Sequence, residues 1–379
     1  MNNVSSIHDC FGCGVCAAAC SKKCIRIAWN KQGFYEPVVH LDDCIDCGIC
    51  LKVCSFNNET LHETYSPKSY EAWSNDENIR HTASSGGVGF ELARICMKGG
   101  AQTVVVKYVP NKKCAEHYVA VDEKSLMTSM GSKYIQSYTV DALRQIDFKH
   151  KVFFSGTPCQ VASLRRWIRM RKAEDRFILV DFFCHGVPSA LAWKNYLAIH
   201  ESETGKLHRV SWRDKDTAWH DSWAMLLQGE KGTVHVRRSE GDLFYSIFLG
   251  GWCMNPACRK QCKFKYDKSS ADIRIGDLWG NKYKSDTEGV SALVAFTKKG
   301  QELISTLQRC TVIPSTFDVV AQGQMKENAK GAWLSPLVMW QLSRQKKLSL
   351  KEWKMYNRME FYAHIPLLLL RKILQMIKR

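Results

Sequence analysis

The sequence predicts three parts: a small cysteine-rich α+β module at the N-terminus, a larger mixed α/β domain, and a basic helical tail. Nine of the 17 cysteines fall within the first 54 residues, short apolar strands then alternate with helical patterns, and Lys and Arg are densest after Arg344. With 379 residues, 45% of them hydrophobic and 24% charged, the chain is too apolar for disorder and too interrupted for a polytopic membrane protein. We expect the parts to cover residues 1–60, 61–320 and 321–379.

The first residues, MNNVSSIHDC, lack a basic stretch followed by an apolar run, so no secretory signal is expected. We therefore expect a cytoplasmic, thiol-reducing setting, where disulfides are rare. In that setting 17 cysteines indicate metal or redox chemistry.

The N-terminal cysteines form an internal repeat. The run Cys10-x2-Cys13-x2-Cys16-x3-Cys20 is followed by a second run of the same spacing, from Cys44 to Cys54. Three thiolates in one tight turn converge on an iron–sulfur cube, and in bacterial two-cluster modules the fourth cysteine of each run serves the other cluster. We therefore predict two [4Fe–4S] clusters with these ligand sets: Cys10, Cys13, Cys16 and Cys54 for one, and Cys44, Cys47, Cys50 and Cys20 for the other.

Zinc is the alternative metal, but it usually takes two CxxC pairs separated by a longer loop, and a triple CxxCxxC is poor zinc geometry. One departure is that Ser21 and Ser55 replace the Pro that usually follows the fourth cysteine. The ninth cysteine, Cys24, is interpreted as a small apolar residue of the module.

The larger domain begins after residues 56–70, a polar stretch with a Pro that is typical of a linker. Strands are predicted at residues 102–108, 119–121, 151–155 and 177–183, and helices follow several of them.

The first of four chemically suggestive loops in this domain is TASSGGVGF, residues 82–90. It leads into a helical pattern, and small hydroxyl and glycine residues at a helix start favour an anion such as phosphate. An ordinary capped helix remains the alternative.

The second and third loops follow the strands at 151–155 and 177–183. One carries Cys159 at a helix start, where the helix dipole is expected to lower the thiol pKa, and the other carries Cys184 and His185. The carboxyl ends of neighbouring strands are where open α/β sheets bind ligands. A buried structural role is the alternative for each cysteine.

The fourth loop holds Cys253, Cys258 and Cys262 and precedes the segment ADIRIGDLWG. Three cysteines in ten residues predict a third iron–sulfur cluster or a zinc ion, with Cys159 or Cys184 as a further ligand.

Five motifs, TASSGG, GSKYIQS, GTPCQ, CHGVPS and ADIRIGDLWG, stand in that order behind the duplicated cysteine run. Together they resemble the coenzyme F420 hydrogenase/dehydrogenase beta-subunit family over residues 1–320. The resemblance implies an FAD-containing iron–sulfur oxidoreductase that moves electrons between ferredoxin-type clusters, a flavin and a substrate. Bacterial relatives of this layout often sit among surface-polysaccharide genes.

The resemblance also implies roles for single residues. Those expected to bind FAD are Ser84, Ser85, Gly86 and Gly87 at the phosphates, Ser132, Lys133 and Tyr134 along the cofactor, and Gly156, Thr157 and Pro158 near the ring. Lys133 is a candidate counter-charge to the pyrophosphate, with a solvated surface lysine as the alternative.

Four residues are candidates for the reaction itself: His185, Cys159, Cys184 and Asp277. His185 is the expected proton donor, because the unperturbed pKa of histidine lies near neutrality. Asp277 is expected to hydrogen-bond flavin or substrate, although an Asp beside Gly often only fixes a turn. The CxxC usual before the GDxWG segment is here Cys258-x3-Cys262.

The formal net charge is +17, and none of the excess lies in residues 1–60. The segment from Arg344 to Arg379 contains ten Lys and Arg but only two acidic residues. Within it, residues 366–379 repeat apolar side chains at helical spacing. This pattern predicts a basic amphipathic helix, too short to span a bilayer, that would hold the protein on the inner face of an anionic membrane. Packing on the protein's own core is the alternative.

We expect no nucleic-acid partner, because no RNP, zinc-finger or helix-turn-helix signature accompanies the basic residues. A basic surface would steer an acidic redox protein of the ferredoxin or flavodoxin type, and a deazaflavin or nicotinamide donor is the other candidate. The expected function is an FAD-dependent iron–sulfur oxidoreductase acting on a small-molecule substrate. An electron-relay subunit without its own substrate is the alternative.

Overall fold

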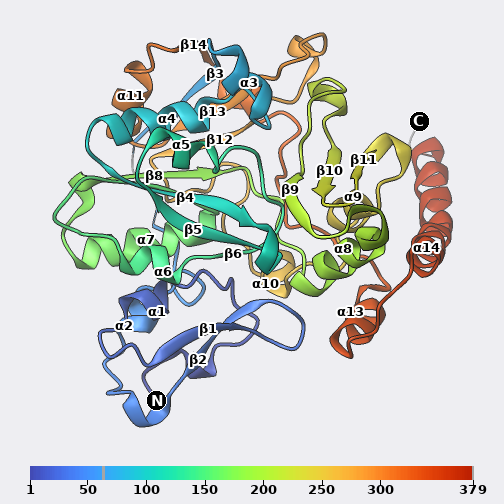
Figure 1. The fold of residues 1–379 in the computed structure, drawn as a ribbon, viewed down its shortest axis with the longest axis horizontal. Coiled ribbons are helices and arrows are strands. Elements are labelled where there is room, and N and C mark those ends of the chain that lie inside the picture. The colour runs from blue at the N-terminus through green and yellow to red at the C-terminus, as the bar shows by residue number, and fades with distance from the viewer. Residues whose placement is uncertain (62–64, 378–379) are drawn as a thin grey trace.

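The structure is a computed structural model that describes residues 1–61 and 65–377, with side chains through residue 363. Figure 1 shows the N-terminal module below a large sheet, and the last two helices at the right-hand edge of the molecule.

The N-terminal module keeps the repeat of its sequence. Each cysteine run ends in a short helix after a left-handed glycine: α1 (Val15–Ala19) follows Gly14 and α2 (Ile49–Lys52) follows Gly48. An antiparallel hairpin of β1 (Ile25–Trp29) and β2 (Tyr35–Val39) lies between the two runs in the chain.

The larger part is built on one mixed sheet of nine strands, in the order β14-β3-β13-β12-β8-β7-β4-β5-β6. The strands are β3 (Lys68–Ser74), β4 (Gln102–Val109), β5 (Cys114–Ala120), β6 (Ser137–Tyr138), β7 (Val152–Ser155), β8 (Phe177–Phe182), β12 (Ile273–Asp277), β13 (Ser291–Ala295) and β14 (Cys310–Ser315). The central strands β4, β7, β8 and β12 run parallel, and β12-β13-β3-β14 are antiparallel. The predicted mixed α/β fold is confirmed, with β4, β7 and β8 at the predicted places, whereas the strand expected at 119–121 begins earlier, at Cys114.

The α-helices that follow the N-terminal module are α3 (Glu77–Thr82), α4 (Val88–Lys98), α5 (Glu123–Met127), α6 (Val140–Arg144), α7 (Pro158–Met170), α8 (Ala190–Thr204), α9 (Leu243–Leu249), α10 (Pro256–Lys260), α11 (Lys298–Ser305), α12 (Phe317–Val320), α13 (Ser335–Ser343) and α14 (Leu350–Ile377).

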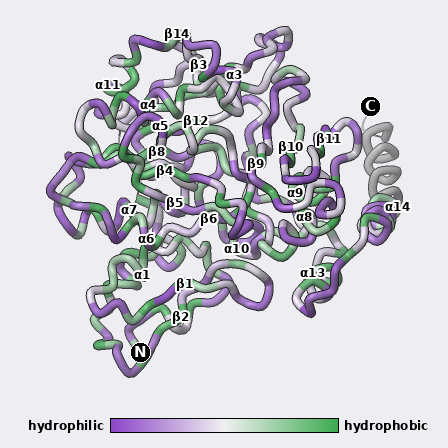
Figure 2. The backbone as a smooth tube through the Cα atoms, in the orientation of Figure 1, coloured by the Kyte–Doolittle hydropathy of each residue, from purple (hydrophilic) through white to green (hydrophobic). Residues whose placement is uncertain are grey.

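Both faces of the central strands are covered, which explains why they are apolar throughout. In β7, Val152 and Phe154 pack with Trp167 of α7, while Phe153 between them packs with Leu92 of α4 on the other face. Hydrophobic residues accordingly concentrate on the central strands (Figure 2).

A second, three-stranded sheet was not predicted. It consists of β9 (Leu207–Ser211), β10 (Ala224–Gly229) and β11 (Thr233–Arg237) in the order β11-β10-β9. Its core includes Trp193 of α8 and Phe244 of α9, and also Val338 of α13 and Trp353 of α14. The beginning of the expected basic tail therefore packs on the protein's own core.

Two further expectations concern segments that lie partly outside the described residues. Of the expected linker 56–70, residues 68–70 belong to β3, and residues 62–64 lie outside the described part. The backbone of α14 continues to Ile377, but the side chains of the amphipathic pattern at 366–379 lie outside the described residues. None of the helices within the described residues has the length and apolar character needed to cross a bilayer.

Candidate redox site

The first predicted cluster set encloses a small cavity in the N-terminal module. Cys10, Cys13 and Cys16 of the first run and Cys54 at the end of the second run all line it. The rest of its wall is mainly apolar, formed by Val4, Ile7, Phe11, Ile27, Pro37 and Phe56. Gly12 N–H donates to Cys10 Sγ at 3.3 Å. Four thiols around one apolar space are the donor set of a [4Fe–4S] cluster, so these residues fit that group.

The second predicted set lies nearer to solvent. Besides burial, the thiols of Cys47 and Cys44 raise the pKa of Cys50, and Cys47 itself is exposed. Cys24 Sγ lies 3.5 Å from Cys20 Sγ, and after burial the neighbouring Cys20 and Cys44 raise the Cys24 pKa to about 12. The structure thus brings the second set together and places Cys24 beside it, which its interpretation as an apolar filler did not predict.

A single zinc ion needs a different arrangement of thiols from an iron–sulfur cluster. Zinc thiolates lie about 2.3 Å from one ion. Among the side chains of residues 1–61 and 65–363, no three from His, Cys, Asp or Glu are arranged to hold one metal ion. The first set instead surrounds a space, as cluster ligands do.

Helix α7 ties the first thiol set to the larger domain. The Cys13 thiol donates to Ser163 Oγ at 3.3 Å, and the Ser55 N–H donates to the same oxygen at 3.0 Å. The Ser55 hydroxyl donates to the Cys159 carbonyl at 3.2 Å. The Ser55 hydroxyl oxygen also accepts the Ser163 hydroxyl at 2.8 Å. A proline has neither an N–H nor a hydroxyl, so the Ser at position 55 adds three contacts that the usual Pro could not make.

A third group of thiols gathers where α7 and α10 meet the loop after β8. Asn255 N–H donates to Val187 O at 3.0 Å, which fixes this loop against the start of α10. Burial is the main cause that raises the pKa of three thiols there, and neighbouring thiols add to it: Cys258, Cys13 and Cys184 for Cys159, Cys262 for Cys184, and Cys184 and Cys262 for Cys258. The third group is therefore Cys159, Cys184, Cys258 and Cys262.

Cys253 is separated from this group. It has a positive φ of 51°, and it is fully buried in the hydrophobic core with Trp252 and Val338. Burial alone raises its thiol pKa. The predicted triplet is therefore corrected: Cys258 and Cys262 are joined by Cys159 and Cys184, and Cys253 is a core residue.

The expected low pKa of Cys159 is also corrected. Cys159 is the second residue of α7, as predicted, but it is only partly exposed to solvent. Burial raises the pKa of the thiol well above its ordinary value and outweighs the helix terminus.

A cavity of about 420 Å³ opens at the carboxyl ends of β7, β8 and β12, facing the start of α4. This volume is typical of cofactor sites, which span about 300–1,000 Å³. Predicted site residues that line the cavity are Ser84, Ser85, Gly87, Ser132, Lys133, Tyr134, Gly156, Thr157, Cys184, His185 and Asp277. Gly86, Pro158 and Cys159 are absent from its wall.

In the 84–87 loop, two of the expected phosphate contacts are already used within the protein. The Ser85 hydroxyl donates to Val290 O at 2.8 Å, and Gly86 N–H donates to Ser291 Oγ at 3.0 Å. Gly86 is required by packing, because a Cβ there would lie 2.5 Å from the carbonyl oxygen of Ala72. In the structure these two groups hold the loop in place, and the phosphate contacts expected of Ser85 and Gly86 stay a prediction.

Ser84 and the start of α4 remain available to an anion. Ser84 Oγ accepts the Ser132 N–H at 2.7 Å, which joins two of the predicted motifs, and its own hydroxyl hydrogen is left for a ligand. Gly87 caps α4, and the first N–H groups of a helix have no partner within it.

Lys133 is half-buried at the cavity wall rather than extended into solvent. Its Nζ donates to the carbonyl oxygens of Ser129, Met130 and Gly131 at 2.6–2.9 Å. Burial lowers the pKa of Lys133 to about 7. An anion in the cavity would favour the charged form.

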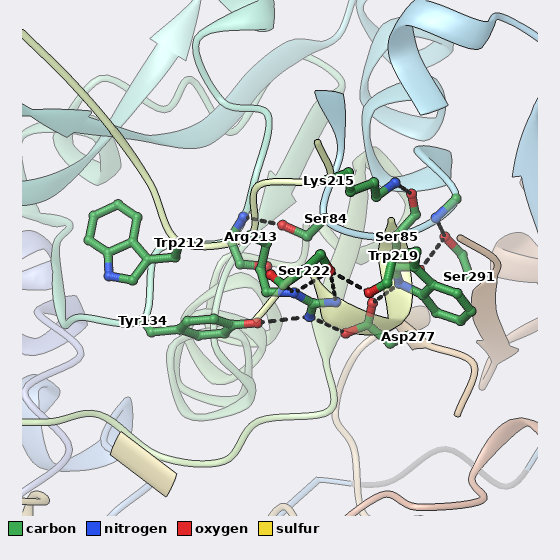
Figure 3. A network of polar contacts seen from close by, with 12 residues as sticks. Ser84, Ser85, Tyr134, Trp212, Arg213, Lys215, Trp219, Ser222, Asp277 and Ser291 are labelled. Carbon is green, nitrogen blue, oxygen red and sulfur yellow. Dashed lines mark hydrogen bonds and ion pairs between the residues drawn. The ribbon is translucent and has the colours of Figure 1, made fainter. Parts of the chain in front are cut away.

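Sequence reasoning missed Arg213. Its side chain is fully buried and donates to Asp277 Oδ2 at 2.9 Å, to Tyr134 Oη at 3.2 Å and to the Ser222 hydroxyl, as Figure 3 shows. The only available signal was an arginine among the tryptophans of SWRDKDTAW.

Asp277 is accordingly held from two sides. Its Oδ1 accepts the Trp219 Nε1–H at 3.2 Å, opposite the Arg213 contact. Lys215, another missed residue of the same network, donates to the carbonyls of Arg80 and Ser85, and burial lowers its pKa to about 7.

Stacked aromatic rings form one wall of the cavity. Tyr134 stacks on Phe248 at 4.8 Å and on Trp223 at 5.8 Å between ring centroids, and Trp279 stacks on Trp223. The Arg213 guanidinium lies 4.6 Å from the Trp223 centroid. A flat aromatic wall beside a helix start fits a cofactor with a planar ring and a phosphate.

His185 borders the cavity, but not with the predicted pKa. Burial, and then the nearby Lys265, lower its pKa to about 4. The neutral ring donates from Nε2 to Phe248 O at 3.1 Å. The reason given for His185 as a proton donor, a pKa near neutrality, therefore does not hold.

Comparison with known families agrees with this geometry. The sequence model of the N-terminal part of the coenzyme F420 hydrogenase/dehydrogenase beta subunit matches residues 69–144, and that of its C terminus matches residues 149–315. The chain belongs to this family. A 4Fe-4S dicluster domain matches residues 9–58, so this member of the beta-subunit family is an iron–sulfur redox protein.

Among solved structures, one similar chain belongs to a xenon-derivatized F420-reducing [NiFe] hydrogenase complex from Methanosarcina barkeri. The identity is 19% and the TM-score 0.46, and the match covers 76% of this chain and 91% of that one. No functionally curated protein matches this sequence.

Proposed function

We propose that the protein is an FAD-dependent oxidoreductase that passes electrons between [4Fe–4S] clusters, a flavin and an organic substrate or electron carrier. The observation that carries the proposal is the cavity: it is lined by the predicted flavin residues, and one of its wall residues, Cys184, belongs to the third thiol group. A bound FAD supplies the exchange between one-electron and two-electron chemistry.

We propose three cluster ligand sets. The first is Cys10, Cys13, Cys16 and Cys54; the second is Cys44, Cys47, Cys50 and Cys20; the third is Cys159, Cys184, Cys258 and Cys262. Neighbouring thiols in each set support these assignments, and the dicluster domain match supports the first two.

Each group of cavity residues would have its own role in binding the flavin. Ser84 and the start of α4 would bind phosphate, with Lys133 as counter-charge. The aromatic wall of Tyr134 and Trp223 would face the ring system. Arg213 would hold Asp277 with its carboxylate at the cavity wall, where it can accept a hydrogen bond from the ring or from a substrate.

The test is anaerobic purification of the full chain with iron, acid-labile sulfide and flavin measured on one sample. About twelve irons and one FAD per chain are expected for three clusters and a flavin. Iron without flavin would refute the reductase and leave the electron-relay subunit, which needs a partner for turnover.

We extend the proposal to surface-polysaccharide synthesis, with an electron donor of the ferredoxin or flavodoxin type, or a deazaflavin or nicotinamide. The basic tail would hold the enzyme on the inner face of the membrane, close to lipid-linked precursors.

A further inference from the structure

Helices α13 and α14 each have a second apolar face that points outward. On α13 and just before it, Trp333, Leu337 and Trp340 recur at helical spacing and are exposed, Trp333 by 69%. The inward side of the same helix carries Val338 and Leu342, which are buried.

The described part of α14 repeats this arrangement. Trp353 and Tyr356 are buried, and the Trp353 Nε1–H donates to Asn195 Oδ1 of α8 at 2.7 Å, which anchors the helix. Its exposed side chains include these apolar ones: Met355, Met359, Phe361 (61%) and Tyr362 (63%).

The two exposed faces form one surface. Tyr356 Oη donates to Gln341 Oε1 at 2.9 Å, and the Glu360 carboxylate accepts the Trp333 N–H at 2.7 Å. Both helices lie at the right-hand edge of the molecule (Figure 1). We call this surface, residues 333–362, the tail face.

The tail face is strongly basic. Its exposed cations are Arg344, Lys346, Lys347, Lys351, Lys354 and Arg358. Its two acidic residues have partners already: Glu352 pairs with Lys346 at 2.9 Å, and Glu360 accepts backbone N–H groups. The charge offered outward is therefore positive.

We propose that the tail face binds an anionic lipid surface. Exposed tryptophan and tyrosine among cations are typical of side chains at the membrane interface, where the rings sit at the headgroups and Lys and Arg are attracted to anionic lipids. A second copy of this chain would bring one basic face against another, which argues against a dimer here. The inference extends the proposed membrane location and does not depend on clusters or flavin.

The test is flotation of the full-length holoprotein with phosphatidylcholine vesicles that either contain or lack phosphatidylglycerol. The wild type should float with the anionic vesicles and lose binding as salt is raised. The variant Trp333→Ser with Trp340→Ser should bind at least about tenfold more weakly, and reversal of Lys351, Lys354 and Arg358 to Glu should abolish binding.

The matched control is Val121→Ser with Met127→Ser, which removes two exposed apolar side chains away from the tail face and should bind as the wild type does. Undiminished binding of the double tryptophan variant would overturn the proposal and leave residues 366–379 as the lipid contact. Self-association that the tryptophan variant abolishes, without vesicle binding, would also overturn it. Iron and flavin content should match the wild type in every variant. A loss of vesicle binding can then be distinguished from a failure of the redox proposal, which would appear as missing iron or flavin in the wild type.

Discussion

Replacing Arg213 by Met should lower the free energy of unfolding by about 3 kcal/mol. Removing one partner of a buried ion pair costs about 3–5 kcal/mol, because it leaves the other charge uncompensated. The Arg213 side chain is fully buried, whereas Asp277 is 16% exposed to the cavity and keeps the hydrogen bond from Trp219. The lower end of the range therefore applies.

The measurement is urea unfolding of the anaerobic holoprotein, followed by tryptophan fluorescence. With a slope of about 3 kcal/mol per molar urea, a loss of this size lowers the midpoint by about 1 M. The matched control is Arg209→Met, because Arg209 is exposed and donates to the uncharged Gln228 Oε1 at 3.3 Å. It should change stability by less than about 0.5 kcal/mol.

A double-mutant cycle identifies the cause. Asp277→Asn alone should also destabilise, since it leaves the Arg213 charge buried, but the double variant should lose much less than the sum of the two. Strict additivity, or equal midpoints for the Arg213 and Arg209 variants, would refute the claim that this pair organises the cavity wall.

Three further predictions concern the cofactors. Cys54→Ser should remove about four irons per chain, whereas Cys24→Ser should remove none, as measured by iron assay and electron paramagnetic resonance. Cys258→Ser should likewise cost about four irons and Cys253→Ser none, and loss of iron in the second variant would contradict the third set. Because burial lowers the Lys133 pKa to about 7, FAD affinity should be highest below pH 7 and fall as pH rises and the charge is lost. Lys133→Met should bind FAD more weakly than the wild type at low pH and should lose this pH dependence, and a variant that keeps the wild-type pH profile in a flavin titration would contradict the counter-charge role.

The parts that the sequence predicted well are those encoded locally. The duplicated cysteine runs fix spacing within single turns, and β7 and β8 are continuous apolar runs followed by helices. Their loops meet at one sheet edge because parallel neighbours end on the same side, which brings Gly156 and Cys184 to one cavity.

The errors concern contacts between distant segments. Arg213 and Asp277 are 64 positions apart, and no local pattern marks their pairing. Cys253 lies in the same short segment as Cys258. Its own backbone is left-handed, however, and its side chain lies in the hydrophobic core. The pKa predictions for Cys159 and His185 failed for one reason: the degree of burial, which dominates both shifts, is a property of the assembled fold.

The placement of the three thiol sets favours an enzyme over a relay. Cys47 of the second set is exposed, the first set is enclosed, and Ser163 and Cys159, one turn apart on α7, face the first and third sets respectively. Under the proposed ligand assignments, an electron entering at Cys47 would move inward and reach Cys184 at the cavity wall. A relay needs a second exposed set where electrons leave, whereas the four cysteines of the third set are each only partly exposed and Cys184 lines a cavity large enough for a cofactor. The path therefore leads to a place where chemistry can occur within this chain.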